Sequence, residues 1–168
     1  MPKLIRLKDG VFGWEEDRFS LVADEDEAMP AGDVIVSLKR FMAEGEQLLA
    51  ERQVGVKLGP TEAVEDLVYD LPRLALVALE FPTHRDGRNL SAARLLRQRY
   101  GYAGEIRAVG EVLREQAQHM VRCGIDAFAA ADGSTPQIWD QAAHRYRHVY
   151  QRAADDRTPA FVERGTGN

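Results

Sequence analysis

Arginine side chains gather in one segment of an otherwise acidic chain. The 168 residues include 22 Lys and Arg against 27 Asp and Glu, a formal net charge of −5, yet residues 84–107 contain six arginines, no lysine and two acids. A planar guanidinium binds phosphate, sulfate or carboxylate through two parallel hydrogen bonds. The segment therefore indicates a site for a small anion. The alternative is a solvated helix face that carries several of the arginines.

Within this segment, the loop at residues 82–91 has the position in which a ligand is most expected to bind. It follows the apolar run LALVALEF, and ligands of parallel α/β proteins bind beyond the carboxyl ends of strands, where the next helix presents free N–H groups. Gly87 lets a ligand approach the backbone, Arg88 supplies a fixed charge, and Ser91 adds a hydroxyl on the same side of the first helical turn.

The next apolar run, EIRAV, brings one more arginine toward the same edge. Arg107 shares a strand face with Glu105 by the two-residue period, and its position near a strand end lets it converge with Arg88. The predicted anion site therefore consists of Asp86, Gly87, Arg88, Ser91 and Arg107.

Both halves of this prediction have a structural alternative. In the loop, Asp86 or Asn89 caps the helix and the arginine between them is solvated. In the strand, Arg107 is buried and forms an ion pair with Glu105 or Glu80.

These candidate residues need a scaffold that brings their loops to one edge. From residue 34 the chain repeats a short apolar run, a turn and an amphipathic helical segment. Strands separated by helices imply right-handed crossovers and a mostly parallel sheet. The pattern predicts an α/β fold and leaves open whether the sheet is open or a partial barrel. The predicted strands are DVIVSL, VGVKL, LALVALEF, EIRAV and DAFAA, and the predicted helices cover residues 38–52, 61–71, 90–100, 111–123 and 136–152.

The two ends of the chain differ from this repeating core. LIRLKDGVF near the N-terminus places two short strands around Asp9-Gly10, which is typical of a β-hairpin. We interpret residues 1–33 as a hairpin appendage and an acidic loop that lie outside the sheet, residues 34–152 as one α/β domain, and residues 153–168 as a flexible tail. A chain of this length builds one sizeable core.

Composition excludes several classes of function. Cys123 is the single cysteine, which excludes an intramolecular disulfide and a four-thiolate iron–sulfur or zinc site within one chain, and we predict no metal. No apolar stretch has the length of a bilayer crossing and no signal peptide is recognisable. We therefore predict a cytoplasmic protein without membrane or nucleic-acid partners.

No cofactor is evident from the sequence. The glycine spacings of a Walker loop and of a dinucleotide fingerprint are missing. A nicotinamide or flavin that dissociates stays open as a cofactor, and the sequence does not indicate an oligomeric state.

One long string resembles a known bacterial family. DGRNLSAARLLRQRYGYAGEIRAVGEVLREQAQHMVRCGIDAF is similar to the pattern of the DUF934 family, in which Asp-Gly-Arg-Gly-x-Ser is followed by Gly-Tyr-x-Gly-Glu-x-Arg-Ala and by Arg-Cys-Gly. The resemblance covers residues 34–130, and VYQ at 149–151 extends it. We interpret Asn89 as a residue that tolerates positive φ in place of glycine. The other departures are Glu111 and Glu115 in place of aspartate and Ile125 in place of phenylalanine.

The resemblance implies a pathway more firmly than a reaction. The family is commonly described as an oxidoreductase of sulfite reduction, a description that rests largely on neighbouring genes. A sulfite reductase needs cysteines for its cluster and sirohaem, and a sulfonucleotide reductase needs a catalytic cysteine in its C-terminal tail. This chain, with Cys123 alone, is neither enzyme by itself.

Two functions from different classes follow from the resemblance and the residues together. The first is an accessory protein or oxidoreductase of assimilatory sulfite reduction that binds a small oxyanion or a sulfonucleotide. The second is a non-catalytic module that docks, through its acidic N-terminal region, on sulfite reductase, a sulfonucleotide reductase or an electron donor. Whether the chain is an enzyme stays open; if it is, Tyr102, Glu111 and Gln116 are the candidates for proton transfer.

Overall fold

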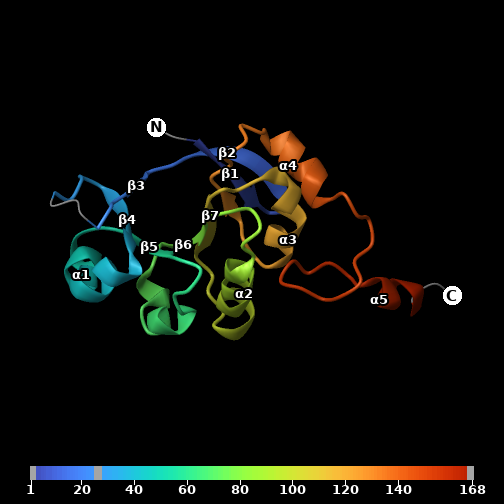
Figure 1. The fold of residues 1–168 in the computed structure, drawn as a ribbon. Helices are drawn as coiled ribbons and strands as arrows, with labels where there is room; N and C mark the ends of the chain where they lie inside the picture. Colours follow the sequence, from blue (N-terminus) through green and yellow to red (C-terminus); the bar gives the residue numbers. More distant parts are fainter. Residues whose placement is uncertain (1–2, 25–27, 166–168) are drawn as a thin grey trace.

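The computed structural model describes residues 3–24 and 28–165 of the chain. Within these residues eight strands form one sheet, in the order β2-β1-β8-β7-β6-β5-β4-β3 (Figure 1). The strands are β1 (Lys3–Lys8), β2 (Val11–Glu16), β3 (Phe19–Leu21), β4 (Asp33–Ser37), β5 (Val54–Leu58), β6 (Leu76–Phe81), β7 (Glu105–Gly110) and β8 (Ala127–Phe128).

Helical segments connect the parallel strands. The longest, α1, begins directly after β4, where the hydroxyl of Ser37 accepts a hydrogen bond from the backbone N–H of Arg40 at 3.1 Å. None of the helices in the described parts of the chain has the length and apolar character that a bilayer crossing requires. The α-helices are α1 (Leu38–Glu51), α2 (Arg88–Arg94), α3 (Ala117–Arg122), α4 (Pro136–Ala143) and α5 (Ala160–Gly165); η1 (Val64–Leu67), η2 (Leu71–Arg73) and η4 (Arg114–Gln116) are 3-10 helices, and η3 (Leu95–Arg99) is a π-helix that continues α2.

Three predicted helices differ from the structure. In the predicted helix 111–123 the helical residues begin at Arg114, with η4, and the α-helix begins at Ala117. The predicted helix 61–71 is replaced by η1 and η2, because no side chain caps the start of η1 and Pro72 disfavours the α conformation of the residue before it. The predicted helix 136–152 ends at Ala143, and beyond it Val149 forms a parallel bridge with Pro159.

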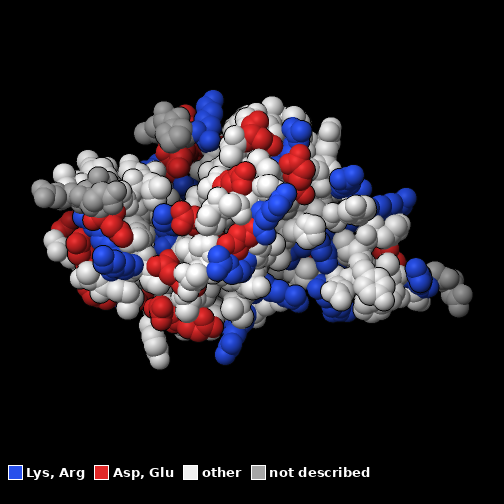
Figure 2. Space-filling model, in the orientation of Figure 1, with Lys and Arg blue, Asp and Glu red and all other residues white. Residues whose placement is uncertain are grey.

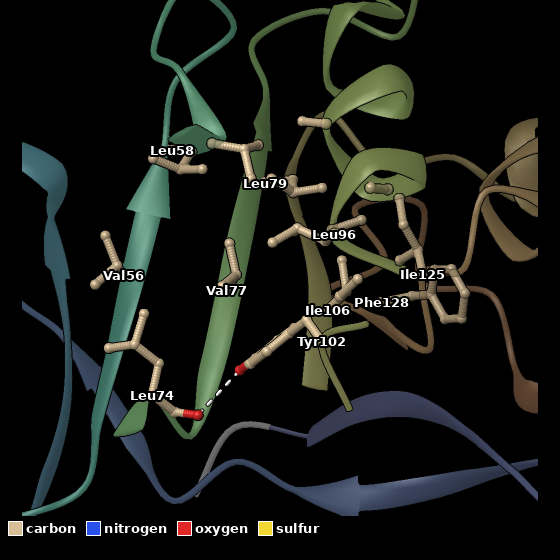
Figure 3. Close-up of a cluster of buried hydrophobic side chains, with 14 of the residues drawn as sticks. Val56, Leu58, Leu74, Val77, Leu79, Leu96, Tyr102, Ile106, Ile125 and Phe128 are labelled. Carbon is tan, nitrogen blue, oxygen red and sulfur yellow. Dashed lines mark hydrogen bonds between the residues drawn. The ribbon is translucent and has the colours of Figure 1, made fainter. Parts of the chain in front are cut away.

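The middle of the sheet is parallel and its strands follow the order of the chain. β4 to β8 each pair in parallel with their sequence neighbours. Sequential order with right-handed crossovers places the connections on one face of the sheet, where strand side chains such as Val56, Val77 and Ile106 are buried (Figure 3). The predicted α/β class and the mostly parallel sheet are confirmed.

A two-residue connection between β2 and β3 requires the sheet to curl. These strands form opposite edges of the sheet, and in a flat sheet with a strand spacing of about 4.8 Å they would lie about 34 Å apart. Asp17 and Arg18 alone separate them in the sequence, and the three Cα-to-Cα steps across this connection span at most about 11 Å. The sheet is a curled half-barrel, which answers the question that the sequence left open.

The N-terminal strands belong to the sheet. β1 and β2 form the predicted antiparallel hairpin, but β1 also pairs with β8 through Ile5–Phe128 and Arg6–Ala127, and β3 pairs with β4. The expectation that residues 1–33 lie outside the sheet is therefore wrong for these strands. The backbone N–H and C=O groups at the edges of β8 and β4 need partners, which β1 and β3 supply.

Gly55 in β5 tests how tightly the face without helices is packed. A Cβ at this position would lie 2.6 Å from Cγ of Leu76 and 3.2 Å from Cγ1 of Ile35. Because such overpacking costs about 1–3 kcal/mol, Gly55→Ala should lower the free energy of unfolding by about that amount in urea titrations. Gly13→Ala is the matched control, since nothing lies within 4 Å of its Cβ position. Equal stability of the two variants would contradict this packing.

Candidate functional site

The carboxyl ends of β6 and β7 bring two loops together. Phe81 and Gly110 are register partners there, and the backbone N–H of Glu111 donates to the carbonyl of Phe81 at 2.8 Å. Gly110 has φ +96, and a Cβ on it would lie 2.4 Å from that carbonyl oxygen, so only glycine permits this approach. Residues 82–87, which follow β6, therefore lie beside the segment that begins at Glu111.

His84 is the residue on which the two loops converge. Oε2 of Glu111 accepts a hydrogen bond from the backbone N–H of His84 at 2.6 Å and lies 3.2 Å from Nδ1 of its ring. Nε2 of Gln116 donates to the carbonyl of His84 at 2.5 Å. Two of the three predicted catalytic candidates thus meet at a histidine that sequence reasoning missed. The signal that could have found His84 is the parallel strand order, which places the loops after β6 and β7 side by side.

The contacts with His84 lower the pKa of Glu111. The backbone N–H of His84 is the largest cause, its ring follows, and the charge of Arg85 adds to the effect. The side chains of His84 and Glu111 are 45% and 44% exposed. An ionised carboxylate can only accept hydrogen bonds, so the imidazole hydrogen in this contact belongs to Nδ1.

Arg88 is held by Asp86 within the same loop. The guanidinium donates to the carboxylate through Nε at 2.9 Å and Nη2 at 2.5 Å, and the backbone N–H of Arg88 donates to Oδ1 at 3.2 Å. The side-chain hydrogen bond from Arg88 is the largest cause of a lowered Asp86 pKa. Asp86 thus occupies part of the guanidinium that the sequence assigned to a ligand. The Arg88 side chain is still 59% exposed.

Asn89 anchors the start of α2 to two strand ends. Its buried amide Nδ2 donates to the carbonyls of Leu58 at 3.2 Å and Glu80 at 2.8 Å. Among the described non-glycine residues, positive φ occurs at Asp9 and Asp156 only. The interpretation of Asn89 as a positive-φ residue is therefore wrong: it lies in the first helical turn, and its side chain fixes the loop above β5 and β6.

Gly87 and Ser91 lie on the exposed side of this helix start. Gly87 has φ −89, and a Cβ there would lie 3.6 Å from Leu90, an ordinary contact. The backbone does not demand glycine at this position, and the missing side chain leaves the loop open to approach. Ser91 lines a shallow hollow of about 380 Å³ together with Arg94, Leu95, Gln98 and Arg99.

Arg107 does not reach this loop. It lies on the face of the sheet that is opposite α2. Its side chain is 4% exposed and pairs with Asp17 at 2.8 Å and Glu105 at 2.6 Å. The predicted convergence with Arg88 is therefore wrong, and the ion-pair alternative describes Arg107, because a buried guanidinium requires carboxylates beside it. One of these, Asp17, comes from the β2–β3 connection.

Tyr102 lies at the opposite end of the sheet from His84. Its hydroxyl donates to the carbonyl of Leu74, just before the start of β6, at 3.1 Å (Figure 3). The side chain is 6% exposed, and burial raises the pKa of the phenol. The structure does not bring Tyr102 together with the other predicted catalytic candidates, and its hydroxyl stabilises the core.

Positive charge does not form a continuous patch around the loop. Figure 2 shows Lys and Arg side chains interspersed with Asp and Glu over α2 and the loop before it. Arg85 is exposed and has no hydrogen bond or salt bridge to any described residue. Within residues 3–24 and 28–165, no three His, Cys, Asp or Glu side chains are arranged to hold a metal ion. The arrangement suits a small anion that contacts a few guanidiniums.

A comparison with models of protein families identifies the family of the chain. Residues 55–161 match the model of DUF934, a bacterial protein of unknown function. The chain belongs to this family. No curated protein matches it. The resemblance inferred from the sequence is confirmed, although the match begins later than residue 34 and continues past residue 130.

Several residues that carry the DUF934 resemblance have structural tasks. Gly124 has φ +96, and a Cβ on it would lie 2.3 Å from Cγ of Arg97; a Cβ on Gly104 would lie 2.2 Å from the hydroxyl of Tyr102. Arg97 donates to the carbonyls of Gly124, Tyr102 and Gly104 at 2.9, 2.6 and 2.7 Å. This part of the motif therefore fixes the packing around Arg97, whereas residues 86–88 lie at the carboxyl edge.

The pKa of Glu111 reports its contact with His84. In NMR titrations of carboxyl carbons, Glu111 should have a pKa below the ordinary range of glutamate. In His84→Ala this pKa should rise only partly, because the backbone N–H, the largest cause, remains. Since the folded-state pKa is the lower one, the stability from this contact is present at neutral pH and is lost as the pH falls through that value. An ordinary pKa in the parent protein would contradict the geometry.

Proposed function

We propose that this DUF934 protein is an accessory protein of assimilatory sulfite reduction that binds a small oxyanion or a sulfonucleotide at residues 82–91. The observation that carries the proposal is the exposed, arginine-bearing loop at the carboxyl edge of a parallel half-barrel. Ligands of parallel α/β folds bind at this edge. The pathway rests on the description commonly given to the family, and the anion rests on the residues.

Two guanidiniums are available to an anion at this edge. Arg85 is exposed and unpaired within the described residues, and Arg88 is bound to Asp86 through Nε and Nη2, which leaves Nη1. Gly87, between them, adds no side chain, and the exposed hydroxyl of Ser91 is a further donor. A hydrogen bond from a charged donor contributes about 1.5–3 kcal/mol.

The Asp86 carboxylate competes with an anion for the guanidinium of Arg88. Its carboxylate already accepts from the guanidinium and the backbone N–H of Arg88. A ligand oxyanion must therefore share Arg88 with this carboxylate or displace it. Repulsion between the two negative charges weakens binding, so the removal of the Asp86 charge should strengthen it.

A second candidate function is a module that docks on sulfite reductase, a sulfonucleotide reductase or an electron donor through the N-terminal region. β2 is an edge strand of the sheet, and its Val11 and Trp14 side chains are 68% and 53% exposed. Unpaired strand edges form hydrogen bonds with other chains. Glu16 at the end of β2 adds negative charge to this edge, whereas Glu15 pairs with Lys8 of β1.

Anion affinity tests the site assignment. Arg85→Ala and Arg88→Ala should each weaken sulfite or sulfate binding roughly ten- to hundredfold in calorimetric titrations, because each removes a charged donor. Asp86→Asn should strengthen binding. Arg94→Ala is the matched control, since Arg94 lies at the other end of α2 from Arg88 and donates to Gln98 at 2.7 Å. An unchanged affinity in folded Arg88→Ala would assign the arginines to a solvated helix face.

Growth on different sulfur sources tests the pathway. Deletion of the gene should impair growth on sulfate or sulfite and spare growth on cysteine, because cysteine bypasses sulfite reduction. Restoration by the parent gene and not by the Arg88→Ala gene would connect the pathway to the loop. Equal growth of the deletion strain on all three sources would count against a role in sulfite reduction.

A further inference from the structure

Within the described residues, the rings of two histidines contact a glutamate, and one of these histidines lies in the proposed anion site. Nδ1 of His84 lies 3.2 Å from Oε2 of Glu111, and Nδ1 of His148 lies 2.6 Å from Oε2 of Glu163. Only the first pair stands at the carboxyl edge, beside an unpaired arginine of the described chain. His84 also has both of its backbone polar groups bound, the N–H by Glu111 and the C=O by Gln116. The backbone of His84 is therefore held from two directions, and Glu111 also contacts its ring.

The contact with Glu111 determines which ring nitrogen of His84 is free. The carboxylate can only accept, so the neutral imidazole carries its hydrogen on Nδ1 and a lone pair on Nε2. Nε2 has no hydrogen-bond partner among the described residues, and the side chain is 45% exposed. The residue that precedes Arg85 in the chain thus offers a proton acceptor at Nε2.

Gln116 holds His84 at an energetic cost. While its Nε2 donates to the carbonyl of His84, its Oε1 is buried and has no hydrogen-bond partner within the described residues. A buried polar group without a partner costs about 1–3 kcal/mol. Local violations of this kind are typical of residues whose position serves a function.

We propose that His84 is the acid–base residue of the oxyanion site, with Glu111 and Gln116 as its positioning residues. The inference rests on the proposed function. When a fully ionised oxyanion binds beside Arg85 and Arg88, Nε2 of His84 takes up a proton from solvent, and the new N–H donates to an anion oxygen. No bond to the anion forms or breaks, and no electron is transferred.

The charges around the ring favour this coupling. Arg85 repels a protonated His84 in the free protein, whereas Glu111 stabilises it. A bound anion offsets the repulsion, so proton and anion each strengthen the binding of the other by the same factor. Glu111 contacts the ring, and the charge of Arg85 acts on Glu111. The Asp86–Arg88 pair follows in the same loop, and the Arg114–Glu115 pair directly precedes Gln116 in the chain.

Calorimetry with sulfate tests the proposal, because sulfate stays fully ionised at neutral pH and any proton must bind the protein. Sulfate is titrated into the full chain in buffers that differ in ionisation enthalpy. The dependence of the observed heat on that enthalpy gives the protons taken up. Above neutral pH we expect up to about one proton per sulfate and an affinity that falls as the pH rises, by up to about tenfold per pH unit.

Substitutions show which side chain takes up the proton when sulfate binds. His84→Gln should still bind sulfate through the two arginines, more weakly, without proton uptake and with a flat pH profile. Glu111→Gln should keep proton uptake but shift it to lower pH, since the carboxylate that stabilises the protonated ring is gone. His148→Gln is the matched control, because its ring has the same contact with a glutamate away from the loop, and it should behave as the parent.

The outcomes separate this inference from the proposed function. Sulfate binding in the parent without proton uptake, or equal uptake in His84→Gln, would overturn the acid–base role and leave the anion site intact. No sulfate heat in the parent would overturn the anion site, and the acid–base role with it.

Discussion

The architecture depends on the two-residue connection between opposite edges of the sheet. The connection formed by Asp17 and Arg18 is too short to cross a flat eight-stranded sheet. The sheet therefore curls toward the face without helices. The curl brings Phe19 of β3 to 5.7 Å from the guanidinium of Arg107 on β7, four strands away. Asp17 then pairs with Arg107, and one buried ion pair ties the edge connection to a central strand.

The parallel pairing of β6 and β7 determines which loops meet at the carboxyl ends of these strands. Because β6 and β7 run in the same direction and end in register at Phe81 and Gly110, the loops that follow them lie side by side. Glu111 and Gln116 then hold His84 within a loop that also carries two exposed arginines. The half-barrel thus separates two kinds of arginine: Arg107 on the face without helices pairs with carboxylates that are largely buried, and Arg85 and Arg88 in the loop after β6 are exposed.

The sequence predicted the scaffold better than the site. Apolar runs and their spacing identified the central parallel strands, because burial of both faces of a strand leaves a clear local pattern. That β1 and β3 pair at the edges was not predicted, since edge pairing depends on the curl of the whole sheet. Arg107 and Tyr102 were placed in the site by their residue type, but burial assigns them to the core. His84 was missed because its partners are 27 and 32 residues away, and only strand order brings them together.

The central claim is that a small anion binds at the carboxyl edge beside β6 and β7. The most direct test is an NMR titration of the isotopically labelled chain with sulfite, in which the backbone amide signals are followed residue by residue. We expect shifts concentrated in residues 82–91 and 111–116. Shifts confined to the larger hollow of about 510 Å³ lined by Arg122, Gly124 and Arg157, or no shifts at millimolar sulfite, would contradict it.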